Sequence, residues 1–132
     1  MVLLGPDLLL GGVSTGSLNS GGYLFTIVPS TDEVTLVTNF SLLTGANPVG
    51  DVVLASDGQL YGLLSQGGTG VFGTLCRFNP TTYQPTVLHA FTGGALDGYK
   101  PYANLLVVGS DIYGVTFSDS THFTVSGAAS PT

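Results

Sequence analysis

The two histidines of this sequence are the side chains best suited to acid–base chemistry. His122 follows Asp119 and Ser120 closely, so the residue types of a Ser–His–Asp triad occur together. A working triad is assembled in space from separate elements, and neighbours on one strand and turn cannot form it. His89 stands where a repeated segment has Thr38, so the repeat does not require a histidine, and a buried or interface position is predicted. We therefore expect no catalytic histidine.

Metal and cofactor sites need clustered ligands, and this sequence scatters them. The single cysteine, Cys76, excludes an intrachain disulfide and a thiolate cluster. Asp7, Asp57 and Asp111 occupy one turn position three times, which predicts a turn role for each carboxylate. Glu33 is the only glutamate, so nothing indicates the paired carboxylates of a glycosidase. We expect no metal, no cofactor and no enzymatic activity.

The tyrosines are more informative. Tyr83, Tyr99 and Tyr102 are predicted to lie in loops or at loop edges, where aromatic rings can stack on a sugar or anchor a protein partner. Tyr61 and Tyr113 recur in a repeated motif and are predicted to pack between repeats. This distribution favours binding over catalysis.

The composition limits the partners that the chain can have. Apolar residues make up 43% and charged residues 8%, which excludes a solvated disordered chain. The net charge is −6 and the basic side chains are Arg77 and Lys100, so the sequence cannot build a basic face for nucleic acid or an anionic membrane. No apolar run reaches the ~20 residues that span a bilayer. The amino terminus has no positively charged segment, so no secretory signal is predicted.

A repeated motif organises the sequence. It reads DGQLYG in one copy and SDIYG in another, and its recurring residues are Asp57, Gly58, Tyr61 and Gly62 in the first and Asp111, Tyr113 and Gly114 in the second. A degraded copy near the start, PDLLLGG, places Gly12 at 50 residues before Gly62. A period near 50 residues is the signature of a repeat architecture.

Longer segments repeat in the same order. Residues 22–29 match residues 73–80, and residues 35–40 match residues 86–91, both at a shift of 51. Residues 47–58 match residues 100–111. Cys76 takes the place of Phe25 in this alignment, so a buried apolar position is predicted for it. The 132 residues are thus expected to form one domain of tandem repeats.

Apolar runs between turn residues predict strands, and no window has helical periodicity, so the predicted fold is all-β. The first strands (residues 2–4, 52–55 and 105–108) are continuous apolar runs, which predicts burial on both faces. The second strands span residues 8–14, 59–65 and 112–118, the third 23–28 and 74–79, and the fourth 34–40 and 86–91. Alternation in the fourth strands predicts one shared face for Leu36, Thr38 and Phe40, matched by Val87, His89 and Phe91.

Four strands in about 50 residues is the size of a β-propeller blade. We assign residues 1–45 to a first blade, 46–96 to a second, and 97–132 to a partial third unit with closure strands. Closed propellers contain at least four blades, so this chain cannot close a ring alone. Ring closure by homo-oligomerisation is predicted, with a six-bladed trimer favoured over a dimer of three-blade chains. The third unit would pair with the first blade of a neighbour and hide both sheet edges.

These repeats resemble the tandem GloVer-type repeats of large secreted or surface-attached bacterial proteins. The matching segments are PYANL at residues 101–105, DGQLYG at 57–62, the glycine pair at 67–68, GTL at 73–75, LHAF at 88–91 and DGYKP at 97–101. The resemblance covers residues 46–118 closely and residues 1–45 loosely. It implies a propeller-forming repeat, and it carries over no catalytic residue.

We expect a non-enzymatic structural or binding protein. Low charge and abundant Gly, Ser and Thr are typical of an exterior location, and an exterior protein without a predicted export signal fits a virion. The predicted function is a homotrimeric knob that decorates a virus (phage) capsid, with a capsid protein as its docking partner. The alternatives are a glycan-binding module that uses Tyr83, Tyr99 and Tyr102, and a fragment of a larger secreted repeat protein at a cell surface.

Overall fold

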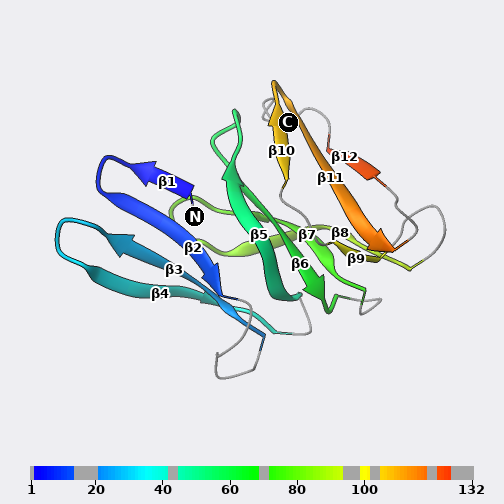
Figure 1. Ribbon diagram of the computed structural model, residues 1–132, viewed down its shortest axis with the longest axis horizontal. Helices are drawn as coiled ribbons and strands as arrows, with labels where there is room; N and C mark the ends of the chain where they lie inside the picture. Colours follow the sequence, from blue (N-terminus) through cyan, green and yellow to red (C-terminus); the bar gives the residue numbers. More distant parts are fainter. Residues whose placement is uncertain are drawn as a thin grey trace.

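Three antiparallel sheets follow one another along the chain in the computed structural model (Figure 1). The structure describes residues 2–13, 21–41, 45–68, 72–93, 99–101, 105–118 and 122–125. The first sheet contains β1 (Val2–Gly5), β2 (Leu8–Val13), β3 (Tyr23–Val28) and β4 (Glu33–Asn39). The second contains β5 (Ala46–Leu54), β6 (Leu60–Gln66), β7 (Thr74–Phe78) and β8 (Pro85–Ala90). The third contains β9 (Tyr99–Pro101), β10 (Leu106–Val108), β11 (Asp111–Ser118) and β12 (His122–Val125). The all-β prediction is confirmed.

The third sheet is built on the plan of the other two. In the first and second sheets, each strand pairs with the strand before it in the sequence. Pro101 of β9 pairs with Thr116 of β11, as Pro48 of β5 pairs with Leu64 of β6. Strands β9 and β10 together therefore take the place of the long strand β5. Proline is tolerated there because an edge strand can leave one N–H side out of the hydrogen-bonded ladder.

The pairing register decides which glycines are equivalent. Gly11 pairs with Phe25 in the first sheet, and Gly62 pairs with Cys76 in the second, so both pairs are related by a shift of 51. The expected equivalence of Gly12 with Gly62 is therefore wrong by one residue. In the sequence alone, Gly11 and Gly12 fit the motif equally well. The strand pairing shows that Gly11 is the equivalent of Gly62. Gly12 instead lies next to Pro48 of the second sheet.

A β-bulge interrupts the fourth strand of the first two sheets. Val37 lies between Leu36 and Thr38, which pair with neighbouring residues of β3, so Val37 has no cross-strand partner of its own. Strand β8 has the same irregularity between residues 87 and 89. A bulge breaks the two-residue alternation, so the predicted shared face of Leu36 with Thr38 and Phe40 is wrong. Leu36 is 50% exposed while the other two are buried, and the same correction applies to Val87.

The middle sheet is covered on both faces by its neighbours. Along β6, Leu60 and Leu64 belong to a core shared with the first sheet, and Tyr61 and Leu63 belong to a core shared with the third. Strand alternation therefore sends successive side chains into two separate cores. The first core contains Leu10, Leu24, Phe40, Val52, Leu60, Leu64, Cys76 and Phe78, and the second contains Ala55, Tyr61, Leu63, Leu75, Phe91, Leu105 and Ile112.

The first strands of the two outer sheets are not buried on both faces. In β10, Leu106 and Val108 are 61% and 53% exposed, and Leu3 of β1 is exposed as well. The predicted double coverage is wrong for β1 and β10, which lie at sheet edges, whereas the equivalent run of the second sheet sends Val52 into the first core and Ala55 into the second. In addition, the first and third sheets each have one neighbouring sheet among the described residues (Figure 1).

Consecutive sheets approach each other closely where they meet. The backbone N–H of Asn47 donates to the carbonyl of Gly21 at 2.7 Å, which joins the first sheet to the second. Gly73, with φ of +100°, lies against the carbonyl of Leu64 and the ring of Pro101. A Cβ added at Gly73 would lie 2.6 Å from the Leu64 carbonyl oxygen. Both the backbone conformation and the space therefore require glycine there.

Replacing Gly73 by alanine tests this close approach. We expect Gly73→Ala to lower the free energy of unfolding by about 3 kcal/mol or more, because the strain of positive φ and the backbone clash add. Gly58→Ala is the matched control, since Gly58 has φ of +81° with no atom within 4 Å of an added Cβ. It should cost only about 1 kcal/mol. Urea unfolding followed by circular dichroism measures both, and equal losses would contradict the close approach.

Candidate functional site: two uncovered sheet faces

The turn of the repeated motif is closed by its own aspartate. Asp57 accepts one hydrogen bond from the backbone N–H of Gln59 at 2.8 Å and another from the hydroxyl of Tyr61 at 2.6 Å. Tyr61 is 3% exposed. Burial raises the pKa of Tyr61 to about 12, helped by the hydrogen bond to Asp57 and by its charge, against a smaller opposing effect of Arg77. The hydroxyl is therefore a fixed donor in the second core and stays protonated at neutral pH.

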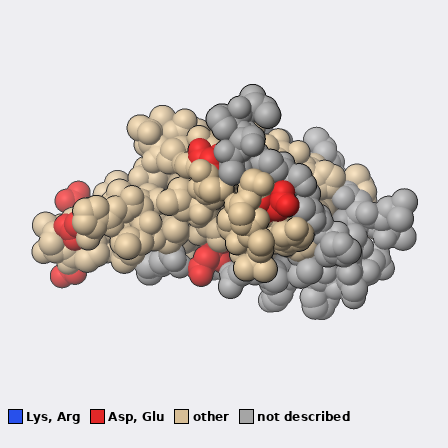
Figure 2. Space-filling view, turned by 90° about the horizontal axis from the view of Figure 1, so that it is seen from above, with Lys and Arg blue, Asp and Glu red and all other residues tan. Residues whose placement is uncertain are grey.

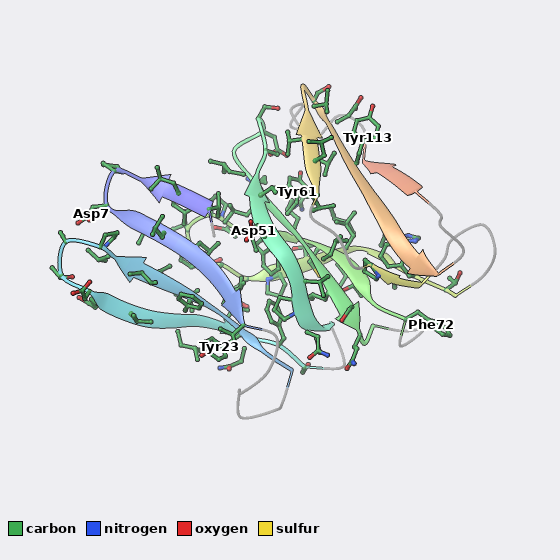
Figure 3. The ribbon with its side chains drawn as sticks, in the orientation of Figure 1. Asp7, Tyr23, Asp51, Tyr61, Phe72 and Tyr113 are labelled. Atoms are coloured by element: carbon green, nitrogen blue, oxygen red, sulfur yellow. The ribbon has the colours of Figure 1, made fainter. Side chains whose placement is uncertain are left out.

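The equivalent aspartate of the first repeat makes a different contact. Asp7 accepts hydrogen bonds from the backbone N–H of Ser30, at 3.0 Å, and from its hydroxyl. The register places Leu10 where the second sheet has Tyr61, and leucine offers no hydroxyl. The carboxylate instead ties the β1–β2 turn to the β3–β4 turn, at the end of the first sheet (Figure 3). The aspartate at this turn position thus binds a neighbouring turn in the first sheet and its own turn and Tyr61 in the second.

Tyr61 and Tyr113 hold the same position in successive sheets but differ in exposure. Tyr61 pairs with Val53, and Tyr113 pairs with Leu106. Tyr61 packs between the second and third sheets, as predicted. Tyr113 is 40% exposed on the outer side of the third sheet (Figure 3). The cause is that the described residues place no further sheet against that side.

The structure describes two of the side chains suited to acid–base or thiol chemistry, His89 and Cys76. His89 is exposed on β8, with its ring edge-on to Phe91 at 4.9 Å between centroids. Its predicted burial is wrong because β8 is the outer edge of its sheet, and its predicted alternative, an interface position, stays a prediction. Cys76 is buried as predicted, 3.4 Å from the Thr74 hydroxyl, and burial raises the pKa of its thiol to about 11. The side chain of His122 lies outside the described residues.

The three tyrosines predicted to contact a ligand or partner are not assembled into one described site. Tyr83 lies in the β7–β8 turn with φ of +60°, half-buried against the first core. Its carbonyl accepts a hydrogen bond from the Thr38 hydroxyl at 2.7 Å, which links the second sheet to the first. The side chain of Tyr99, which is in β9, and the whole of Tyr102 lie outside the described residues.

Charged side chains do not gather into a binding site on the part of the chain that the structure describes. Acidic side chains are visible at separate places, including the end of the first sheet where its turns lie, and no basic side chain is visible on the described surface of that view (Figure 2). Within the described ranges, no group of three His, Cys, Asp or Glu side chains could hold a metal ion. In the same ranges, no helix is long and apolar enough to cross a membrane.

The outer face of the first sheet, which we call the N-terminal face, is apolar. Cross-strand partners share a face, and all members of this face are exposed or half-buried. Phe25 lies at its centre, and the ring of Tyr23 packs edge-on against it at 6.2 Å between centroids. The register of β1 to β4 places the following side chains together on the N-terminal face: Leu3, Leu9, Phe25, Ile27, Val34 and Leu36.

The outer face of the third sheet, which we call the C-terminal face, presents three exposed apolar side chains, with Asp111 opposite Val108 at its edge. Leu106 and Tyr113 are cross-strand partners, and Val108 lies two residues beyond Leu106 on the same side of β10. These three side chains are between 40% and 61% exposed. Sequence reasoning placed Tyr113 between repeats but did not identify either open face. A signal was present, since β10 carries apolar residues at three successive positions and β3 departs from such a run only at Thr26.

An all-β chain whose sheets recur at a shift of 51 residues is a tandem-repeat protein. The family model described as the Gloeobacter/Verrucomicrobia repeat matches residues 3–127. This match covers most of the chain, so the chain belongs to that family, and the resemblance inferred from its motifs is confirmed. Comparisons with curated proteins and with solved structures gave no match.

Replacing Tyr61 by phenylalanine tests the link to Asp57 through its pH dependence. The tyrosine ionises near pH 10 when unfolded and near pH 12 when folded, so the folded state binds more protons between these values. Stability therefore falls as the pH rises from 10 to 12. Tyr61→Phe should remove about 1–2 kcal/mol of that fall, less than the full ~1.4 kcal/mol per pKa unit because the folded tyrosine is only partly ionised at pH 12.

Urea unfolding of both proteins across this pH range measures the difference. Cys76, whose pKa rises from 9.0 to about 11, adds a fall in both proteins and cancels in the comparison. An identical pH dependence for wild type and Tyr61→Phe would show that the hydroxyl is not held as described.

Proposed function

We propose that this chain is a non-enzymatic structural module whose sheets form part of a β-propeller ring. One observation supports the proposal above all: the same packing of sheet on sheet occurs twice in sequence order. A head-to-tail relation that recurs gives a ring when its rotation closes and an open array when it does not; the ring is the arrangement that we propose. The first sheet meets the second through Leu10, Leu24 and Phe40, and their equivalents at a shift of 51, which meet the third sheet, are Tyr61, Leu75 and Phe91.

The number of sheets favours two chains in such a ring. Each chain contributes two sheets of four strands and a third sheet in which β9 and β10 together take the place of one strand, and propellers typically contain four to eight blades. Two chains then give about six blades, whereas three chains would give about nine, beyond that range. The six-bladed trimer expected from the sequence counted two blades per chain. The trimer stays a prediction. It requires the third sheet of one chain and strands of a neighbouring chain to form one blade together.

The setting that we propose is an exterior one, in which the ring decorates a virus (phage) capsid by binding a capsid protein. The composition supports this setting, since only 8% of the residues are charged and two of them, Arg77 and Lys100, are basic. Such a surface suits a protein partner better than nucleic acid or an anionic membrane.

Sedimentation of particles from a culture that produces the chain tests this setting. We expect a band at the chain's own mass in the particle fraction, at a fixed ratio to the capsid protein. Recovery of the sequence within a longer secreted polypeptide would contradict the capsid setting and favour a larger secreted repeat protein.

Glycan binding through the three loop tyrosines is the alternative function. Tyr83 is a poor stacking platform because it is half-buried against the first core, which leaves Tyr99 and Tyr102 as the rings to test. Binding on a glycan array that disappears with Tyr99→Ala or Tyr102→Ala would favour this alternative. A structural module should bind no glycan in that assay.

Light scattering across a dilution series tests the ring itself. The expected result is a mass of two chains that does not change on dilution, because ring closure leaves no interface unpaired. A constant mass of three chains would support the trimer expected from the sequence. A single-chain mass at every concentration would contradict the ring.

A further inference from the structure

The N-terminal face is equivalent to a surface that is buried inside the same chain. In the second sheet, three side chains with the corresponding cross-strand pairing pack on the first sheet and are almost fully buried: Leu60, Cys76 and Phe78. Their equivalents at a shift of 51 belong to the N-terminal face and are only half-buried: Leu9, Phe25 and Ile27. The first sheet therefore exposes the surface that, in the second sheet, is buried against the preceding sheet.

The C-terminal face is equivalent to the other half of that relation. In the second sheet, three side chains contribute to the core that the third sheet completes: Val53, Ala55 and Tyr61. The register places three exposed side chains at the same positions of the third sheet: Leu106, Val108 and Tyr113. The chain thus carries both halves of one contact, at opposite ends of its row of sheets (Figure 1).

We propose that the C-terminal face of one chain binds the N-terminal face of a second copy, in the way that each sheet packs on the next within the chain. This inference rests on the proposed ring and names the surfaces that close it. The occupant is a second copy because the chain offers both complementary surfaces and already joins such surfaces twice. The two faces differ, so the contact is head-to-tail and uses one face of each kind.

Phe25 is the central anchor of this contact. Large aromatic side chains at the centre of an interface carry most of its energy when water is excluded around them. The ring of Tyr23 fixes the orientation of Phe25 before binding, which lowers the cost of ordering it. The other members of the N-terminal face are aliphatic and uncharged, so burial of apolar area is the driving force.

Two charge variants separate the faces. Phe25→Asp places a carboxylate on the N-terminal face and leaves the C-terminal face intact, and Tyr113→Asp does the reverse. Each variant alone should have the mass of a single chain, because every contact needs one intact face of each kind. An equimolar mixture should give a species with one copy of each variant, joined by the single contact that remains. Thr86→Asp, at an exposed β8 position outside both faces, should keep the wild-type mass.

Native mass spectrometry and light scattering distinguish the outcomes. If the wild type associates but the mixture does not, the ring proposal stands and these two faces are the wrong ones. Self-association of Tyr113→Asp alone would indicate a symmetric contact between N-terminal faces and overturn the head-to-tail assignment. A wild type that remains a single chain would overturn both proposals.

Circular dichroism and urea unfolding establish that each variant is folded. Leu36→Asp provides a second test of the N-terminal face, because Leu36 is already 50% exposed and its replacement disturbs the fold least. It should behave as Phe25→Asp does, with loss of self-association and recovery of a two-chain species on mixing with Tyr113→Asp. Unchanged association of both N-terminal variants would overturn the proposal.

Discussion

Burial of both faces of every sheet is the constraint on which this structure depends. A sheet with apolar side chains on both faces leaves one of them in water unless a second layer packs on each. The middle sheet meets this requirement, because alternate side chains of β6 enter two cores formed with two different neighbours. The first and third sheets have the same two-sided apolar pattern with one neighbour each. Each of these two sheets therefore has one apolar face that no other sheet covers among the described residues.

Hydrogen bonds at the turns fix the sheets relative to one another while apolar packing supplies the stability. A hydroxyl bridges each junction: Thr38 donates to the carbonyl of Tyr83 at 2.7 Å, and Ser56 donates to the carbonyl of Gly109 at 2.9 Å. Both bonds end on backbone carbonyls, which every residue possesses. Thr38 lies in a fourth strand and Ser56 in the turn after a first strand, so the two junctions are bridged from different positions of the repeat. The partners of Asp7 and Asp57 differ in the same way.

The sequence predicted the repeat and most strands, because residue spacing alone determines both. The third strand of the first repeat, Tyr23–Val28, has the predicted bounds. The bulge at Val37 could not be predicted, because an unpaired residue leaves no mark on an alternating pattern. The exposure of Leu106 also depends on which strand lies at an edge, a property of the assembled sheet. The packing of Tyr61 between sheets was predicted from the repeated motif. The two-sided apolar pattern of β3 and β10 was also readable in the sequence, but which side stays open depends on where the neighbouring sheets lie.

The buried polar groups of the described residues are engaged in holding the fold. Among the described residues, every buried side-chain nitrogen and oxygen atom has a hydrogen-bond partner. Burial raises the pKa values of the Cys76 thiol and the Tyr61 hydroxyl to about 11 and about 12, and Tyr61 donates to Asp57. These two groups are therefore engaged in the turns and cores of the fold. What the described fold leaves unsatisfied is apolar area on two complementary faces, and another sheet of the same kind satisfies it.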